Sequence, residues 1–453
     1  MNRWSSKQEP YLAAALSAIV LLFLLLQQKG IVDQADGILH YQFAKFIFAH
    51  PENAFNHWAK PLYTVIMAGP AMMGMVGIRL MNVLFIAITS YAITRSAQEL
   101  NLKGAWLIGV FAGIGNSITY VVLGGLTEPL FMVIFSGVIY YSIKGNWSLM
   151  YTLLGASLLV RPEAIVILPV FTIYGLLNAK IKYAFYGLVV PGLFTIMGMI
   201  VADYDWHWII TNQPYGATSQ PYGHGDWVHY IHQWHRISPW IMLILAVLSL
   251  VSILREKRIF HLFLFIASFG IVALHVVLWR YGWMGSAGLA RTMTTALPGL
   301  ALCAGFFMSD ILPKPVFAIG LIALIFGIQA YENNRFPLVV DGGQEAAEQI
   351  TQKLKDRGMD WESKKVAYQF SATAYYMNLD PFNRDRIQRF WSIDLDAQPS
   401  GKLKNGDLLI WDSMTGTREG RMTWERVQAD PHLERLDSVT VREKTLVSFL
   451  VRK

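Results

Sequence analysis

Two aspartates that follow the first apolar run have the residue type and setting for acid–base chemistry. Asp33 and Asp36 lie in the segment VDQADGILHY, soon after that run ends near residue 27. Carboxylates are costly to place in hydrocarbon, so both are expected to face water or an aqueous cavity. In a cavity, one of them could accept a proton from a hydroxyl group as a general base. The structural alternative, which spacing alone favours, is that both are solvated loop residues or that Asp36 caps a helix beginning at Gly37.

Three further charged residues occur where other apolar segments end. Glu128 lies in GGLTEPL, and Arg161 and Glu163 lie in LLVRPEAIVILP. Charges at such positions are tolerated when they face water or a charged partner. These residues could order the polar lining of a cavity. They could equally form an interfacial ion pair or cap a helix.

Three basic residues could bind a phosphate group. Arg280 and Arg291 stand on either side of a turn rich in Gly, Ser and Ala, and Lys60 lies in WAKPLY. Arginine is permanently charged and can hold a phosphate through two parallel hydrogen bonds. The ordinary alternative for a basic residue at a membrane boundary is to extend toward the lipid headgroups.

The loop 202–238 is long for a membrane connector and rich in aromatic residues. Trp206, Tyr222 and Trp227 offer flat surfaces suited to a sugar ring or a peptide, whereas an interfacial aromatic belt is the ordinary interpretation. Histidines recur there at three-residue intervals, but without a recognised ligand pattern. We therefore predict no metal site in this loop.

Composition decides where these residues must be positioned. The chain has 453 residues, of which 54% are hydrophobic and only 15% charged, and its mean hydropathy is +0.37. A soluble domain carries about 25% charged residues, so this chain must lie in a bilayer over much of its length. A cytosolic enzyme and a disordered chain are excluded. The single cysteine, Cys303, also excludes a disulfide scaffold.

Eleven apolar runs are candidates for membrane spans. They cover residues 11–27, 80–98, 105–122, 129–143, 147–160, 164–178, 183–201, 239–254, 259–278, 292–310 and 315–330. Several are shorter than the roughly 20 residues that a perpendicular helix needs. We predict a mainly α fold, a polytopic membrane helix bundle of about eleven spans.

The apolar stretch 62–78 decides the topology, because counting it as a span reverses the sidedness of everything after it. It is interrupted by Gly69, Pro70, Gly74 and Gly77. If it lies at the interface, the short basic loops all face the cytoplasm, as the positive-inside rule requires. These loops contain Lys103, Lys144, Lys180, Lys182, Arg255, Lys257, Arg258 and Lys314. We therefore expect a cytoplasmic N-terminus and place the acidic and basic candidates together on the outer side.

After Tyr331 the composition becomes that of a soluble domain. Residues 342–358 predict an amphipathic helix, and 365–370 and 407–411 predict strands. A further helix near 421–429 and a strand near 445–452 complete a small α/β domain, which the topology places outside the cytoplasm. The predicted domains are 1–330, with a first outer loop 28–79 containing interfacial helices, and 331–453.

Five short motifs occur in a characteristic order along residues 10–330. They are KPLY (60–63), RLMNV (79–83), TEPLF (127–131), RPE (161–163) and SAGLAR (286–291). Their order and common sidedness resemble the GT-C superfamily of integral membrane glycosyltransferases. That group includes protein O-mannosyltransferases, the lipid A aminoarabinose transferase and GPI mannosyltransferases. No Walker loop, GxGxxG, HExxH or GxSxG occurs in a credible context, so activation must come with the substrate.

The resemblance implies a membrane enzyme of the hexosyl- or mannosyltransferase type. Such an enzyme moves a sugar, with inversion, from polyprenyl phosphate or dolichyl phosphate to an acceptor hydroxyl on the outer face. The acceptor would be a glycan, a lipid or a protein, and no nucleic acid is involved. Short cytoplasmic loops favour a bacterial inner membrane.

The resemblance also implies roles for individual residues. Asp36 is the candidate base and Asp33 its reserve, and a divalent cation at this pair is left open because many family members have adjacent acids where this chain has D-x-x-D. The residues expected to hold the donor phosphate are Arg291, Lys60 and Arg280. Those expected to order the cavity are Glu128, Arg161, Glu163 and His40, and those expected to contact the sugar or acceptor are Trp206, Tyr222 and Trp227.

Two other classes of function compete with this interpretation. A transporter would place ionisable or broken-helix sites near the middle of the bilayer, whereas here the polar groups gather at one face. A glycan ligase or polymerase of the O-antigen type would use Arg and His in a late outer loop, and the loop 202–238 could serve.

Overall fold

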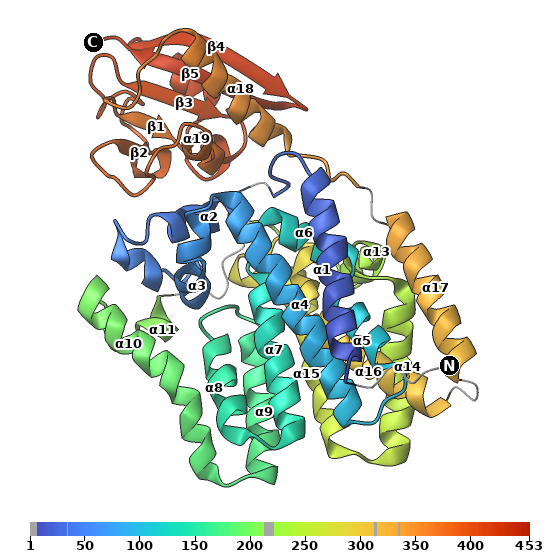
Figure 1. Ribbon diagram of the computed structural model, residues 1–453. Helices are drawn as coiled ribbons and strands as arrows, with labels where there is room; N and C mark the ends of the chain where they lie inside the picture. Colours follow the sequence, from blue (N-terminus) through green and yellow to red (C-terminus); the bar gives the residue numbers. More distant parts are fainter. Residues whose placement is uncertain (1–6, 34, 213–221, 312–314, 334–335) are drawn as a thin grey trace. The chain divides into compact units, whose positions relative to one another are not determined.

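The structure is a computed structural model that describes residues 7–33, 35–212, 222–311, 315–333 and 336–453. It is mainly helical, with one small sheet in the C-terminal part (Figure 1). The chain divides into two compact units. The helical unit comprises Met1–Gln28 and Pro51–Leu338, and the sheet unit comprises Lys29–His50 and Val339–Lys453. Whether the functional domains are 1–330 and 331–453 stays a prediction.

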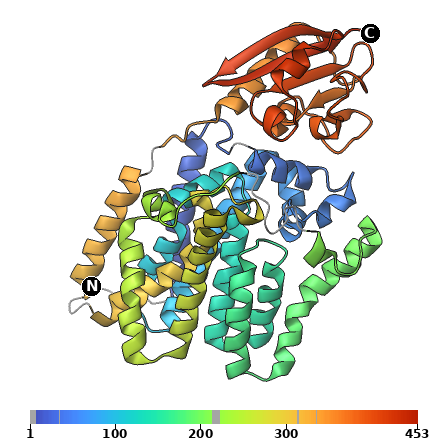
Figure 2. The same cartoon turned by 180° about the vertical axis from the view of Figure 1, so that it is seen from behind.

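The helical unit contains long helices that run side by side (Figures 1 and 2). Its elements are α1 (Glu9–Gln27), η1 (Pro51–Phe55), α3 (Pro61–Ala71), α4 (Met75–Glu99), α5 (Ala105–Gly113), α6 (Asn116–Gly124), α7 (Glu128–Lys144), α8 (Trp147–Ser157), α9 (Ala164–Asn178), η2 (Ile181–Leu188), α10 (Val189–Ala202), α11 (Trp208–Thr211), α12 (His229–His232), α13 (Trp234–Ile237), α14 (Trp240–Glu256), α15 (Ile259–Tyr281), η3 (Trp283–Gly285), η4 (Ala290–Ala296), α16 (Leu297–Ile311) and α17 (Pro315–Asn333).

Each of the eleven predicted runs coincides with a helix or with two consecutive helices. Among the described residues, however, only five helical segments are long and apolar enough to cross a membrane. They are Glu9–Gln27, Met75–Glu99, Ile181–Ala202, Ile259–Tyr281 and Ala290–Ser309. A sixth candidate is the pair formed by α5 and α6, which is bent by 51°. The chain is thus an integral membrane protein, and the number of eleven spans stays a prediction.

The stretch 62–78 does not form one helix. It contains α3, which has 11 residues, and the start of α4. The break between them is at Gly74, whose φ of +77° is accessible to glycine at little cost. Eleven residues extend only about 16 Å, roughly half the hydrocarbon thickness, so α3 is too short to cross a bilayer alone.

Small residues allow the N-terminal helices to approach closely. α5 packs against both α1 and α4. A Cβ added at Gly113 of α5 would lie 2.0 Å from Ser90 Oγ of α4 and 2.3 Å from Ser17 Oγ of α1. The two serine hydroxyls are 2.9 Å apart and share a hydrogen bond. Small residues and interhelical hydrogen bonds of this kind are typical of membrane helix packing.

The sheet unit consists of a five-stranded sheet with helices around it. Its elements are α2 (Asp36–Lys45), α18 (Gly342–Asp356), β1 (Val366–Tyr368), α19 (Ser371–Tyr376), β2 (Ile387–Arg389), η5 (Phe390–Ser392), β3 (Leu408–Asp412), α20 (Thr415–Arg418), α21 (Trp424–Gln428), β4 (Leu433–Val441) and β5 (Lys444–Val451). The strand order is β2-β1-β3-β5-β4. β1 is parallel to β2 and β3, and β5 is antiparallel to β3 and β4.

The predicted small α/β domain is confirmed as a fold, while its side of the membrane stays a prediction. The core of the sheet unit contains Phe390, Leu409, Trp411 and Phe449. α18 packs against β4 and β5.

Candidate active site

Arg161 is the centre of a buried ion network in the helical unit. Its Nη1 lies 3.0 Å from Glu128 Oε1, and its Nε donates to both carboxylate oxygens of Glu163, at 3.0 and 3.2 Å. Nη1 also donates to Thr127 Oγ1 at 2.9 Å. Glu128 is 2% exposed and Glu163 is fully buried. Buried charges need such partners, because each one loses its hydration.

Two turns supply these charges. Glu128 is the first residue of α7 and follows Gly125, whose φ of +71° ends α6. Arg161 and Glu163 lie in the turn between α8 and α9. The sequence interpretation of all three as residues at the ends of apolar segments is therefore correct in placement, and the ion-pair alternative is realised. Their cavity-ordering role stays a prediction.

The network also contains two residues that the sequence analysis did not identify. The ring of His275, in α15, lies with Nε2 3.1 Å from Glu163 Oε1. Thr295, in η4, donates its hydroxyl to the same oxygen at 3.4 Å. The signal that could have found His275 is a buried ionisable residue inside an otherwise apolar helix. Glu163 thus connects the α8–α9 turn to α15 and η4.

Arg291 lies beside this network. It belongs to η4, four residues before Thr295, and its charge is close enough to that of Arg161 to repel it. Glu128 and Glu163 balance the two arginines, so the four groups together are neutral. The role of Arg291 in binding the donor phosphate stays a prediction.

Residues of the first two motifs hold the turn that precedes Glu128. Tyr63, of KPLY, donates its hydroxyl to Gly125 O at 3.0 Å. Asn82, of RLMNV, donates to Leu126 O at 2.9 Å. The five motifs that are far apart in the sequence therefore meet around one buried network.

Lys60, also of KPLY, precedes α3 with a left-handed φ of 65°. Its Nζ donates to His57 O at 3.3 Å. Burial and the nearby Lys60 charge lower the pKa of His57 to about 4, so this imidazole is neutral near pH 7. The phosphate-binding role of Lys60 stays a prediction.

The two candidate bases belong to the sheet unit and differ in what they do. Asp33 is 2% exposed, and its Oδ2 accepts the backbone N–H groups of Gly37 at 2.8 Å and Ala35 at 3.2 Å. Asp33 therefore caps the start of α2. The structural alternative of a cap by Asp36 is wrong, because α2 begins at Asp36 itself and its N-cap position is Ala35.

Asp36 is half-buried and lies near a second carboxyl group. Partial desolvation raises the pKa of Glu419. The negative charges of Asp412 and Asp36 raise this pKa further, whereas the positive charge of Arg389 lowers it. His40, one turn further along α2, is buried. Asp36, Asp33 and His40 thus belong to one unit, and the arginine network and Lys60 belong to the other.

No described residues form a convincing metal site. Within the described part of the chain, no three His, Cys, Asp or Glu side chains are grouped to hold an ion. The carboxylate of Asp33 is already used by two backbone N–H groups. A divalent cation at Asp33 and Asp36 stays a prediction.

Only some of the aromatic side chains in the loop 202–238 are exposed. Trp206 is 72% exposed and Trp227 is 51% exposed, whereas Trp208 is fully buried against Phe55 and His57. Tyr222 is half-buried, and Tyr215 lies outside the described residues.

Arg280 donates its Nη1 to Gly225 O at 3.2 Å and so supports this loop. It lies in the last turn of α15. The contacts of Trp206, Tyr222 and Trp227 with a sugar, and of Arg280 with phosphate, stay predictions.

No protein-family model and no curated protein sequence matches this chain. Solved structures do. A crystal structure of ArnT from Cupriavidus metallidurans bound to undecaprenyl phosphate superposes with a TM-score of 0.65 over 97% of both chains, at 11% sequence identity. The chain has the fold of ArnT.

Two other structures agree with this assignment. ArnT in the apo state matches with the same TM-score of 0.65 over 98% of both chains, at 11% identity. A cryo-EM structure of the arabinofuranosyltransferase AftD from Mycobacteria matches with a TM-score of 0.54 and 14% identity, covering 97% of this chain and 40% of AftD. The resemblance to GT-C glycosyltransferases is thus confirmed for the fold, which ArnT shares with this chain from end to end.

Proposed function

We propose that this protein is a membrane glycosyltransferase that moves a sugar from a polyprenyl-phosphate donor to an acceptor hydroxyl. The observation that carries the proposal is the ArnT fold over 97% of both chains, with undecaprenyl phosphate bound in that ArnT structure. The convergence of five motifs on one buried network adds support from this chain's own residues. A preference for hexose or mannose stays a prediction.

In the proposed reaction, Asp36 accepts the proton of the acceptor hydroxyl. The freed oxygen attacks the anomeric carbon, the bond from that carbon to the phosphate oxygen breaks, and the configuration inverts. The lipid phosphate leaves with the electron pair, and Arg291 and Lys60 stabilise its charge. General-base and electrostatic stabilisation of this kind typically contribute several orders of magnitude in rate.

In this proposal, the network around Arg161 contributes to the reaction by positioning Arg291. Glu163 binds both Arg161 and Thr295, and Thr295 is part of the short helix that carries Arg291. Holding this helix fixes the direction of the arginine before the donor arrives. Preorganised charge is more effective than charge that must first be oriented.

The proposed reaction takes place on the outer face, with a cytoplasmic N-terminus, in a bacterial inner membrane. The short α3 supports this topology, because an interfacial helix before α4 keeps the basic loops on the cytoplasmic side.

The deciding experiment is transfer from labelled polyprenyl-phosphate sugars by the purified full-length protein in lipid nanodiscs. Asp36→Asn should lower the transfer rate by about 10²–10⁴-fold, because the acceptor loses its base. Asp33→Asn should retain most activity, since asparagine is as good a helix cap as aspartate. The matched control is Asp385→Asn, at an exposed position of the same unit.

Each outcome has a definite meaning. Full activity in Asp36→Asn with loss in Asp33→Asn would move the base to Asp33. Failure of the wild-type protein to use any polyprenyl-phosphate sugar would refute the proposed function.

A further inference from the structure

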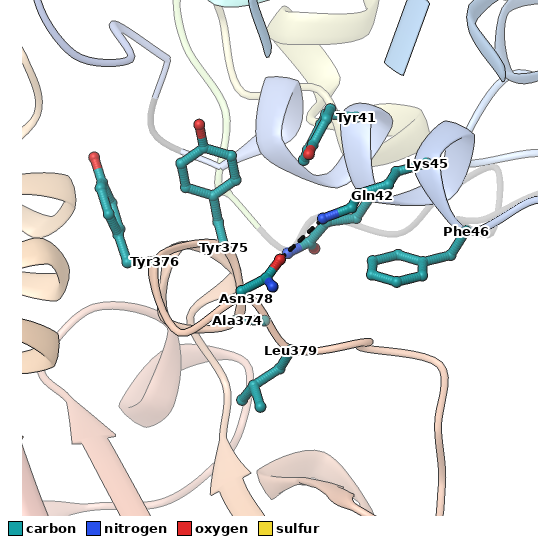
Figure 3. Close-up of a pocket in the computed structure, with 9 residues that line it drawn as sticks. All are labelled: Tyr41, Gln42, Lys45, Phe46, Ala374, Tyr375, Tyr376, Asn378 and Leu379. Atoms are coloured by element: carbon teal, nitrogen blue, oxygen red, sulfur yellow. Dashed lines mark hydrogen bonds between the residues drawn. The ribbon is translucent and has the colours of Figure 1, made fainter. Parts of the chain in front are cut away.

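A pocket of about 360 Å³ lies in the sheet unit, between the C-terminal half of α2 and the end of α19. Figure 3 shows Tyr41, Lys45 and Phe46 on one wall and Tyr375 and Asn378 on the other. The residues that line it belong to the sheet unit, whereas those of the network around Arg161 belong to the helical unit. No motif of the sequence pointed to this pocket. Lys45 follows Asp36 by nine residues, which is about 14 Å along a helix.

Hydrogen bonds between the two elements connect the walls of the pocket. Gln42 of α2 donates its side-chain amide to Ser371 O of α19 at 3.3 Å. Beyond the pocket, the His50 ring lies 2.8 Å from a carboxylate oxygen of Asp380. Such contacts hold the pocket open without a ligand, as expected of a preformed binding site.

Asn378 is placed by an unusual backbone conformation. It follows α19 with a left-handed φ of 52°, which asparagine tolerates better than most residues. The indole of Trp361 donates to Met377 O at 3.1 Å and fixes the same turn. The Asn378 side chain can thereby meet Lys45.

The Lys45 ammonium group is the one charged group among the described residues that line the pocket. Its Nζ donates to Asn378 Oδ1 at 3.0 Å, and it lies 5.6 Å from the centre of the Tyr41 ring and 5.1 Å from that of Phe46. An ammonium group has three N–H donors, and this hydrogen bond uses one. Burial lowers the pKa of Lys45 more than the nearby Asp380 carboxylate raises it, so lost hydration outweighs that one charged neighbour. An anion in the pocket would restore part of the interaction that water no longer supplies.

Three tyrosines form another part of the pocket surface. Tyr41 and Tyr375 meet edge to face with ring centres 5.6 Å apart, and Tyr376 continues the row at 5.1 Å from Tyr375. Aromatic rings with hydroxyl groups offer apolar faces and hydrogen bonds together, which suits a ring that has both. A sugar has such a ring, and a sugar with an acidic group could also form an ion pair with Lys45.

We propose that this pocket binds an acidic sugar unit of the acceptor, with its carboxylate or phosphate at Lys45 and its ring against the tyrosines. The inference rests on the proposed glycosyltransferase function and names the acceptor class as an anionic glycan. The pocket holds a part of the acceptor that is distant from the reacting hydroxyl.

The test measures binding to the full-length protein in nanodiscs by calorimetry or saturation-transfer NMR. The probes are glucuronic acid, glucose 6-phosphate, glucose and inorganic phosphate. We expect at least one acidic sugar to bind about tenfold or more tightly than glucose, and more tightly than inorganic phosphate, because only it makes both the charged and the ring contacts. The two acidic sugars distinguish a carboxylate ligand from a phosphorylated one.

Substitutions assign the binding to this pocket. Lys45→Met keeps the alkyl chain and should weaken the acidic sugar about tenfold or more, while Lys402→Met, at an exposed position of the same unit, should change nothing. Tyr375→Ala should weaken sugar binding in a second, independent way. An unfolding temperature close to that of the wild type confirms that each variant is folded.

Several results would overturn the inference. These are equal binding of glucose and the acidic sugars, inorganic phosphate binding as tightly as glucose 6-phosphate, acidic-sugar binding that survives Lys45→Met, and no binding of any probe. If the sugars fail to bind but transfer from the lipid donor proceeds, only the inference fails. If the sugars bind but the protein uses no lipid-linked sugar, the proposed function is refuted, whereas the assignment of an acidic-sugar site to this pocket stands.

Discussion

Glu163 is fully buried and accepts hydrogen bonds from side chains of three different segments. Removing its carboxylate in Glu163→Ala would leave the Arg161 charge with fewer partners in a buried place. We expect a loss of about 3–5 kcal/mol in stability, because breaking a buried ion pair leaves an uncompensated charge. Thermal unfolding in detergent measures the effect.

The control for this prediction is a pair at the surface. Glu345 is about one-third exposed and pairs with Arg442 at 3.0 Å. Glu345→Ala should cost about 0–1 kcal/mol, because solvent screens such pairs. Equal losses in the two variants would mean that the buried network does not stabilise the fold.

For single residues, the sequence predicted the charged members of the network and missed two of the residues that contact Glu163. Glu128, Arg161 and Glu163 stand out because each interrupts an apolar segment. His275 and Thr295 approach them only through the packing of α15 and η4, which sequence spacing does not reveal. Which of Asp33 and Asp36 caps α2 also depended on the precise start of that helix.

Among the helices, the contact of α5 with α1 and α4 depends on Gly113. Gly113→Val should destabilise the helical unit by about 1–3 kcal/mol, because the new side chain would overlap Ser17 and Ser90. Gly192→Val is the matched control: it also places valine in a helix, but nothing lies within 4 Å of the Cβ position at Gly192. A lower unfolding temperature for both variants alike would show that helix propensity, and not this contact, is responsible.

Elements with strong local patterns were predictable. The apolar runs became helices, and the helix at 342–358 and the strands near 407–411 and 445–452 formed as predicted. β2 was missed because it has only three residues and two of them, Gln388 and Arg389, are polar, whereas the equally short β1 lies in an apolar run. β4 was missed because it is an edge strand with a bulge between Arg435 and Asp437, so its apolar and polar residues do not alternate cleanly.

For the molecule as a whole, the side of the membrane on which the sheet unit lies can be measured directly. The native Cys303 is fully buried, so an added cysteine gives a clean signal. Ser413→Cys, at an exposed position, should react with a membrane-impermeant thiol reagent in intact cells. Protection in intact cells with labelling after lysis would reverse the proposed topology.

The fold of residues 10–330 was predictable from the order of its motifs, although the chain is only 11% identical to ArnT. The five short motifs meet around one network, while the remaining apolar positions need only to be apolar and of suitable size. The sequence did not predict that residues 29–50 pack with the C-terminal sheet. That association depends on contacts more than 300 residues apart, such as the hydrogen bond from Gln344 to the Asp33 carbonyl.

This association has a consequence for the architecture. The backbone passes from one unit to the other after Gln28, after His50 and after Leu338. The sheet unit is therefore tethered three times and is not a removable appendage. A chain shortened to end at Leu338 would still contain Asp36. However, α2 would lose its packing against α19, and Asp33 would lose its hydrogen bond from Gln344, so the segment that carries Asp36 would lose contacts that position it.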